Sequence, residues 1–208
     1  TDPLKLQRQV DYMEKHSDCC MTACATDWIR DGEVFKNHRI SDKPRDLTTK
    51  EVILGGGGYL ATCSLVYDRI RLDGNIPKWR KMANVGDYPL QIQGTLEGKL
   101  HYFPNTMCVY RYCCKGSWTE RYLGERKDQT LIHRQAEIKW MLELEKATKR
   151  KYKREICQRL KPYIRDNYLN NMALVKEYFH VVLVVGNRND IKRMFKDIFK
   201  HMLNMFYN

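Results

Sequence analysis

One aspartate, Asp87, lies in the segment Gly86-Asp87-Tyr88-Pro89-Leu90, and its side chain is the clearest candidate for chemistry in the sequence. A carboxylate is ionised at neutral pH unless its surroundings perturb it strongly. The preceding glycine lets the backbone bring this carboxylate close to a ligand. Within hydrogen-bond reach of a hydroxyl, it can take the proton of that hydroxyl as the oxygen attacks. We therefore interpret Asp87 as a candidate general base; the alternative is an acid that caps a turn or helix ahead of Pro89.

Four consecutive glycines, Gly55 to Gly58, precede this acid in the chain. Such a run is costly to order unless a ligand or a tight path requires it. A phosphate-binding loop would end in Gly-Lys-Ser or Gly-Lys-Thr, whereas Tyr59 and Leu60 follow here. The run is therefore predicted to be a hinge or a loop that approaches a ligand.

Two tryptophans and one arginine could contribute to the same site. Trp79 follows Pro77 and Lys78, and Trp118 follows Gly116 and Ser117. Each indole offers a flat apolar face on which a sugar ring can stack, although either could instead belong to the core. Arg111 could stabilise negative charge on a ligand or pair with a carboxylate of the protein.

The first half of the chain predicts several elements that would position these residues. Apolar spacing after Pro3 predicts an amphipathic helix over residues 3–15. Residues 20–28 are predicted to form a strand, with a hairpin turn at Asp31-Gly32 leading to Val34 and Phe35. A threonine cap predicts a short helix near residues 47–51, and residues 61–67 are predicted to be strand-like or buried.

The second half predicts two strands and then helices. Residues 90–96 read as a helix that stops at Gly98. Residues 99–103 and 107–112 alternate as two strands joined by a turn at Pro104-Asn105. A long helix is predicted over residues 129–160 with an interruption at Pro162, and a final amphipathic helix follows Gly186-Asn187.

Length and composition indicate a globular chain. With 208 residues, 43% hydrophobic and 11% aromatic, it can bury one core together with an appended helical segment. It contains neither a run of about 18 apolar residues nor an N-terminal signal region, so we expect a cytoplasmic protein. The first residue is Thr1 rather than Met, which weakens the argument from the N-terminus.

Eight cysteines raise the question of disulfides or zinc. They include the adjacent pairs Cys19-Cys20 and Cys113-Cys114, which favours reduced thiols over a disulfide framework. The nearest zinc patterns group His16 with Cys19, Cys20 and Cys24, and Cys108 with Cys113 and Cys114. Because neither has paired C-x2-C spacing, no metal site is predicted.

A formal net charge of +12 favours a polyanionic partner: a nucleic acid, an anionic membrane surface or a nucleotide-linked substrate. Much of the charge lies between Lys146 and Arg154 on a predicted helix. This run could also be simply a solvated helix face.

Seven segments occur in an order that resembles the bacterial family 2 glycosyltransferases, which have a nucleotide-sugar-binding α/β (GT-A) fold. The segments are Thr1-Asp2-Pro3-Leu4-Lys5-Leu6-Gln7, Gly56-Gly57-Gly58-Tyr59 through Thr62-Cys63-Ser64-Leu65-Val66, Ile76-Pro77-Lys78-Trp79, Gly86-Asp87-Tyr88-Pro89-Leu90, Gly98-Lys99-Leu100-His101-Tyr102, Met107-Cys108-Val109-Tyr110-Arg111-Tyr112 and Gly116-Ser117-Trp118-Thr119. The resemblance covers residues 1–121, with looser agreement over the helices that follow. It implies an acceptor-side part of a glycosyltransferase domain in residues 1–125 and a helical extension in residues 126–208.

This resemblance implies an inverting sugar transfer from a nucleotide-sugar donor to a saccharide or lipid-linked acceptor, with Asp87 as general base. It gives acceptor contacts to Trp79, Gly86, Tyr88 and Trp118, and the donor diphosphate to Arg111. Gly56, Gly57, Gly58 and Ser64 would form the family's glycine loop and the strand after it. The implied cofactor is a divalent metal, Mg²⁺ or Mn²⁺, whose ligands are expected upstream of Thr1.

Two departures limit the resemblance. Many relatives have a metal-binding histidine after the Tyr-Arg pair, where this chain has Tyr112-Cys113-Cys114. The nucleotide-binding half with its Asp-x-Asp motif would lie before Thr1, so these residues alone are not expected to transfer sugar. The basic helix could rest peripherally on the inner face of the membrane. The alternatives are a basic nucleic-acid-binding module, which the absence of a binding motif disfavours, and a non-catalytic interaction fragment.

Overall fold

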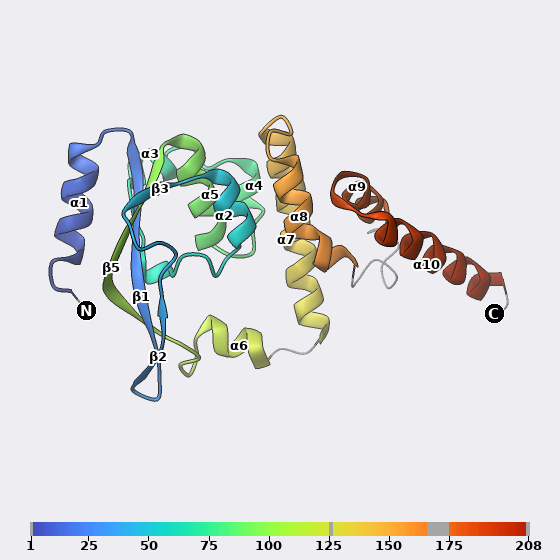
Figure 1. Cartoon of the computed structure of the whole chain (residues 1–208), viewed down its shortest axis with the longest axis horizontal. Coiled ribbons are helices and arrows are strands. Elements are labelled where there is room, and N and C mark those ends of the chain that lie inside the picture. Colours follow the sequence, from blue (N-terminus) through green and yellow to red (C-terminus); the bar gives the residue numbers. More distant parts are fainter. Residues whose placement is uncertain (1, 125–126, 166–174, 207–208) are drawn as a thin grey trace. The chain divides into compact units, whose positions relative to one another are not determined.

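The computed structural model (Figure 1) describes residues 2–124, 127–165 and 175–206. The chain divides into two compact units, Thr1–Thr130 and Leu131–Asn208. The first contains a five-stranded mixed sheet with helices, and the described part of the second is helical. The prediction of an α/β fold followed by C-terminal helices is therefore confirmed at this level. None of the helices within the described ranges has the length and apolar character needed to cross a membrane.

The sheet is built on two long parallel strands, β1 (Cys19–Arg30) and β5 (Lys99–Arg111). Its order is β2-β1-β5-β3, where β2 (Glu33–His38) and β3 (Arg45–Leu47) are antiparallel to their neighbours. A further short strand, β4 (Val66–Tyr67), also pairs antiparallel with β1. Asp31 and Gly32 both have positive φ in the turn between β1 and β2, which confirms the predicted hairpin.

Helix α1 (Lys5–Lys15) and the helices that connect β3 to β5 lie on opposite sides of β1 and β5 (Figure 1). The alternation of side chains along β1 explains this, because Thr22 accepts a hydrogen bond from Gln9 of α1 and Met21 packs beneath Gly94 of helix α5 (Asp87–Glu97). The connecting helices are α2 (Thr49–Gly55), α3 (Arg69–Asp73), α4 (Lys78–Lys81) and α5 (Asp87–Glu97). The 3₁₀ turn η1 (Thr62–Ser64) lies between α2 and α3 in the chain, and its Ser64 carbonyl accepts a hydrogen bond from Gln9 of α1.

The predicted threonine cap is confirmed at α2. The Thr48 hydroxyl accepts a hydrogen bond from the Glu51 N–H, and the Glu51 carboxylate accepts one from the Thr48 N–H, which forms a capping box. Burial raises the pKa of Glu51, but the hydrogen bonds from Thr48 and Arg45 outweigh it and leave the pKa below its usual value.

Two predicted boundaries are wrong. Residues 99–111 form one continuous strand, not two strands with a turn at Pro104-Asn105. Phe103 pairs with Cys24 and Thr106 pairs with Ala25, so Pro104 and Asn105 are taken up as a bulge. The helix predicted over residues 129–160 is also divided, into α7 (Lys127–Ala147) and α8 (Lys153–Arg165), and Pro162 lies inside α8 instead of interrupting the structure.

The break after α7 is a Schellman motif without its usual glycine. The Lys149 N–H donates to the Lys146 carbonyl and the Arg150 N–H donates to the Glu145 carbonyl. Lys149 has φ 49° and Arg150 has φ 64°, a backbone conformation for which glycine is the usual residue. The sequence rules therefore gave no signal here. The second unit continues with α9 (Val175–Val185), which was not predicted as a helix, and α10 (Arg188–Phe206), which confirms the final helix predicted after Gly186-Asn187.

Candidate functional site

Asp87 begins helix α5 and is half-buried, with its carboxylate held at both oxygens. Oδ2 accepts a short hydrogen bond from the Thr62 hydroxyl of η1, and Oδ1 accepts one from the Tyr88 N–H at 2.8 Å. A carboxylate in the first helical turn is favoured by the helix dipole, which agrees with the alternative capping role. Each carboxylate oxygen has a second lone pair, so the group can still accept a proton from a bound hydroxyl.

The glycine run, Gly55 to Gly58, lies beside Asp87, but only some of its positions require glycine. A Cβ on Gly57 would be 3.8 Å from the Cβ of Tyr88, the residue after Asp87. Gly56 requires glycine because its φ is +71°, whereas Gly57 and Gly58 have room for a Cβ at ordinary φ. Gly55, which was not among the predicted site residues, is the most constrained of the four, since a Cβ there would overlap Cγ of Tyr59.

This contrast gives a matched pair of variants. Gly55→Ala is expected to lower the free energy of unfolding by about 1–3 kcal/mol, because the new methyl overlaps the base of the Tyr59 side chain. Gly58→Ala meets no atom within 4 Å and should be neutral or stabilising by up to about 1 kcal/mol. Urea unfolding followed by circular dichroism measures both. If the two variants had the same urea midpoint, a methyl group at Gly55 would not overlap Tyr59, and the backbone of the glycine run would differ from that in the structure.

Three predicted site residues are in the core. Trp79 is 3% exposed and Tyr88 is 2% exposed, with the Tyr88 hydroxyl donating to the Ile53 carbonyl. Ser64 is fully buried, and its hydroxyl donates to the Ala61 carbonyl at 2.7 Å. None of these side chains presents a surface to a ligand. We therefore remove all three from the site, because their burial and hydrogen bonds explain them as packing residues.

The other predicted residues are at the surface. Trp118 begins α6 (Trp118–Gly124) and is 48% exposed, so part of its indole lies at the surface. Gly86 is exposed with an ordinary helical backbone, and a Cβ there would contact nothing within 4 Å, so the close approach argued from glycine is not needed. Arg111 is exposed at the end of β5 and, among the described residues, has no ion-pair partner.

An aromatic cluster that was not predicted from the sequence lies at the end of the sheet where β5 finishes with Arg111. We define it as Trp28, Phe35, Tyr110 and Tyr112. The Trp28 and Tyr112 rings stack at 5.5 Å, and Phe35 and Tyr110 meet them edge-on. Two exposed cations cover it: Arg30 lies 4.9 Å from the Tyr112 ring centroid, and Lys36 lies 4.4 Å from that of Trp28. Aromatic residues two apart, as in Tyr110 and Tyr112, were the available sequence signal.

The aromatic cluster is connected to the other candidate residues by hydrogen bonds. The Tyr110 hydroxyl is 2.5 Å from the Thr119 hydroxyl, which places Trp118 at this end of β5. His38 contacts the Trp28 ring, and its Nε2 is 2.9 Å from the Tyr59 carbonyl of the glycine loop. Arg111, in contrast, lies on the opposite face of β5 from Tyr110 because side chains alternate along a strand.

Three cysteines pack η1, the turn that contains Thr62, against the sheet. The Sγ atoms of Cys24 on β1 and Cys63 on η1 each lie 3.7 Å from Sγ of Cys108 on β5. Hydrogen bonds from Cys24, and then from Cys63, lower the pKa of Cys108, and the same bonds raise the pKa values of the two donors. All eight cysteines are free thiols. Cys108 and Tyr110 share a face of β5, about 7 Å apart along the strand, so the cysteine cluster and the aromatic cluster lie on the same face of this strand.

The divalent metal implied by the resemblance is expected to have its ligands upstream of Thr1, and the described residues offer no group of three oxygen ligands for it. The one group of three candidate ligand side chains in the described part of the chain is Glu145, Cys157 and His180, in the second unit. Mg²⁺ and Mn²⁺ prefer oxygen ligands, and this group offers a thiol and an imidazole as well. No chemical step at Asp87 is therefore derived through a metal.

Comparison with known proteins gives a distant relationship. No protein-family model matches the chain, and neither does any solved structure. Three proteins described as uncharacterized are similar to it: Rv1520 and MT1570 of Mycobacterium tuberculosis, and Mb1547 of Mycobacterium bovis. Each is 31% identical over 130 residues, which make up 61% of this chain and 36% of the relative. The matched region thus spans about a third of the length of these relatives, and their descriptions assign no activity.

Proposed function

We propose that residues 2–124 form the acceptor side of a glycosyltransferase of the GT-A type, in which Asp87 takes the proton of the acceptor hydroxyl. The observation that carries the proposal is the carboxylate itself. It is half-buried at the start of α5, oriented by the Thr62 hydroxyl and the Tyr88 N–H, and bordered by the glycine loop. A general base needs this combination of fixed geometry and access to the proton it removes.

The aromatic cluster and Trp118 support a sugar-containing ligand at the adjoining surface. Aromatic side chains with one polar edge suit saccharide rings, which have apolar faces and hydroxyl rims. Arg30 and Lys36 add positive charge on the same cluster, which suits the phosphates of a nucleotide sugar or of a lipid-linked acceptor. In this proposal Arg30 and Lys36 bind the phosphates, a role that was predicted for Arg111.

Turnover tests the proposal directly. The chain, together with any coding sequence that adjoins it upstream, is incubated with UDP- and GDP-linked sugars, a divalent metal and saccharide or polyprenyl-phosphate acceptors. Release of nucleoside diphosphate that depends on the acceptor and on Asp87 is the expected result. A protein that binds none of these donors, but binds polynucleotide with steep salt dependence, would favour the nucleic-acid alternative.

An anionic membrane surface is the partner we propose for the basic residues after α7. Lys149, Arg150, Lys151 and Arg154 are exposed around the Schellman turn. Each such cation near an anionic surface contributes about 1 kcal/mol. Loss of two cations costs about 2 kcal/mol and the two new carboxylates add repulsion, so the double variant Lys151→Glu, Arg154→Glu is expected to weaken binding to phosphatidylserine vesicles by roughly 30-fold or more.

Vesicle co-sedimentation measures this effect, and α10 supplies the control. Lys192→Glu with Lys196→Glu makes the same change in net charge at two other exposed positions. Retained binding in the α10 variant and lost binding in the first would locate the contact at the turn. Binding that does not depend on anionic lipid would reject the membrane partner.

A further inference from the structure

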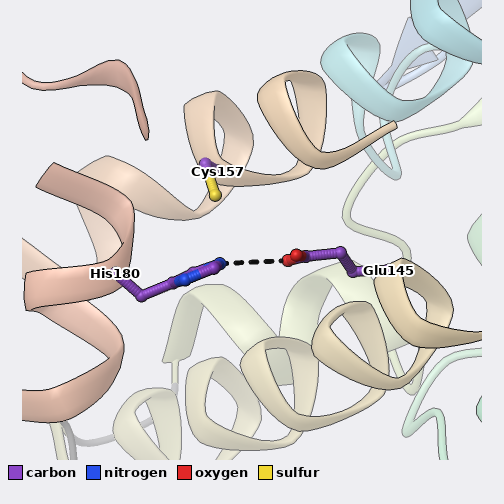
Figure 2. Close-up of side chains that lie close together, drawn as sticks. All are labelled: Glu145, Cys157 and His180. Atoms are coloured by element: carbon purple, nitrogen blue, oxygen red, sulfur yellow. Dashed lines mark hydrogen bonds and ion pairs between the residues drawn. The ribbon is translucent and has the colours of Figure 1, made fainter. Parts of the chain in front are cut away.

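Glu145, Cys157 and His180 come together in the unit Leu131–Asn208, although 35 residues separate the first from the last (Figure 2). They come from three helices: α7, α8 and α9. The ligand-type atoms of the three side chains all lie within 4.8 Å of one another. Glu145 Oε2 is 3.2 Å from His180 Nε2, and the sulfur of Cys157 points toward this hydrogen bond.

The backbone around the group is fixed by the local structure. Glu145 is in the last turn of α7, where its carbonyl accepts the Schellman hydrogen bond from Arg150. Cys157 is on the buried face of α8, beside Ile156 and one turn from Leu160. His180 is on α9 between the buried residues Tyr178 and Val181. The three side chains therefore converge from rigid elements with an apolar surround.

The buried carboxylate of Glu145 depends on His180 for both its hydrogen bond and its charge partner. The Glu145 side chain is 6% exposed, and its only ion-pair partner among the described residues is His180, which is 33% exposed. A buried carboxylate is destabilising unless it is paired and hydrogen-bonded. The Cys157 thiol adjoins this pair with no exposed surface of its own. A divalent cation would neutralise the carboxylate and bind all three groups together.

We propose that Glu145, Cys157 and His180 bind a zinc ion. Sulfur, nitrogen and oxygen donors together are the ligands that Zn²⁺ accepts, at about 2.0–2.3 Å from the metal. Those bond lengths imply ligand atoms about 3.3–3.8 Å apart in a tetrahedron, so the side chains need to close by about 1 Å. Three protein ligands leave a fourth position for water, and the partly exposed His180 is on the side from which solvent reaches the site.

Two other interpretations of the group are weaker. As a nucleophile oriented by a His–Glu pair, Cys157 would need access to a substrate, and its complete burial prevents this. As a simple buried ion pair, Glu145 and His180 would not require a sulfur within 4.8 Å of both. The zinc proposal is independent of the proposed sugar transfer, because it uses only residues of the second unit.

Metal titration of the full chain tests the proposal. After treatment with a chelator and dialysis, one Zn²⁺ per chain is expected to bind, and the melting temperature is expected to rise by about 5 °C or more at saturating zinc. Co²⁺ in place of Zn²⁺ should show the intense visible bands of a four-coordinate site and a thiolate charge-transfer band in the near ultraviolet. Cys157→Ser should abolish the charge-transfer band, and His180→Ala should weaken zinc binding by about 100-fold or more.

Matched variants make the test specific. His133→Ala changes another histidine of the same unit, Cys114→Ser removes an exposed thiol, and Cys108→Ala breaks up the cysteine cluster of the first unit. All three should retain one zinc per chain and the charge-transfer band. His180 is partly exposed, so its variant should stay folded in the chelator, which the melting curve verifies. The proposal would be overturned if the Cys108→Ala variant lost zinc binding while the Cys157→Ser variant kept it. It would also be overturned if the folded wild-type chain bound no zinc.

Discussion

Replacing Asp87 with asparagine is expected to reduce kcat for sugar transfer by roughly 10²–10⁴-fold, the contribution of a positioned general base. The amide cannot accept the hydroxyl proton, but it has nearly the same shape. Its oxygen can still accept the hydrogen bond from the Tyr88 N–H while its NH₂ group donates to the Thr62 hydroxyl, so the start of α5 should keep its structure. KM for the donor should change little, because the lost interaction is made mainly in the transition state.

Two further variants separate catalysis from structure. Asp42→Asn removes a carboxylate that is 92% exposed and should leave kcat unchanged. Thr62→Val keeps the Asp87 carboxylate but removes the hydroxyl that orients it, so a loss of about tenfold or less is expected. Steady-state kinetics with a saturating donor measure all three variants. If Asp87→Asn turned over at the wild-type rate while melting at a lower temperature, Asp87 would be only a helix-capping acid.

Much of the fold could be predicted because local rules were sufficient for it. Thr48 and Glu51 form the capping box that their spacing predicts, and Asp31-Gly32 forms the hairpin turn. The predictions failed where tertiary contacts decide the outcome. A bulge against β1 absorbs Pro104 within a strand, and Lys149 adopts a conformation that sequence rules reserve for glycine.

The candidate site was predictable only as far as its residue types. Asp87 could be chosen from its motif, but the partner that orients it, Thr62, is 25 residues away and belongs to another element. The group of Glu145, Cys157 and His180 has no short spacing at all, because it forms only when three helices pack. The aromatic cluster likewise joins residues of β1, β2 and the end of β5.

The two tryptophans show most clearly what the sequence could not distinguish, and they provide the second large prediction. Trp79→Ala is expected to lower the free energy of unfolding by about 3–5 kcal/mol, because Trp79 is 3% exposed and its removal leaves a large cavity beneath α4. Trp118→Ala should change it by less than about 1 kcal/mol, because this indole is 48% exposed. Urea unfolding measures both, with circular dichroism as the signal.

In the kinetics, the larger effect should come from Trp118→Ala and the smaller one from Trp79→Ala. Trp118→Ala is expected to raise KM for the acceptor by about 2–10-fold, the value of one aromatic stacking contact, without changing stability. Where Trp79→Ala remains folded, at low temperature and without denaturant, its KM for the acceptor should equal that of the wild type. A Trp79 variant that is fully stable yet binds acceptor poorly would return this residue to the acceptor site. Because the two substitutions remove the same side chain, the difference between them isolates the effect of burial from that of the indole itself.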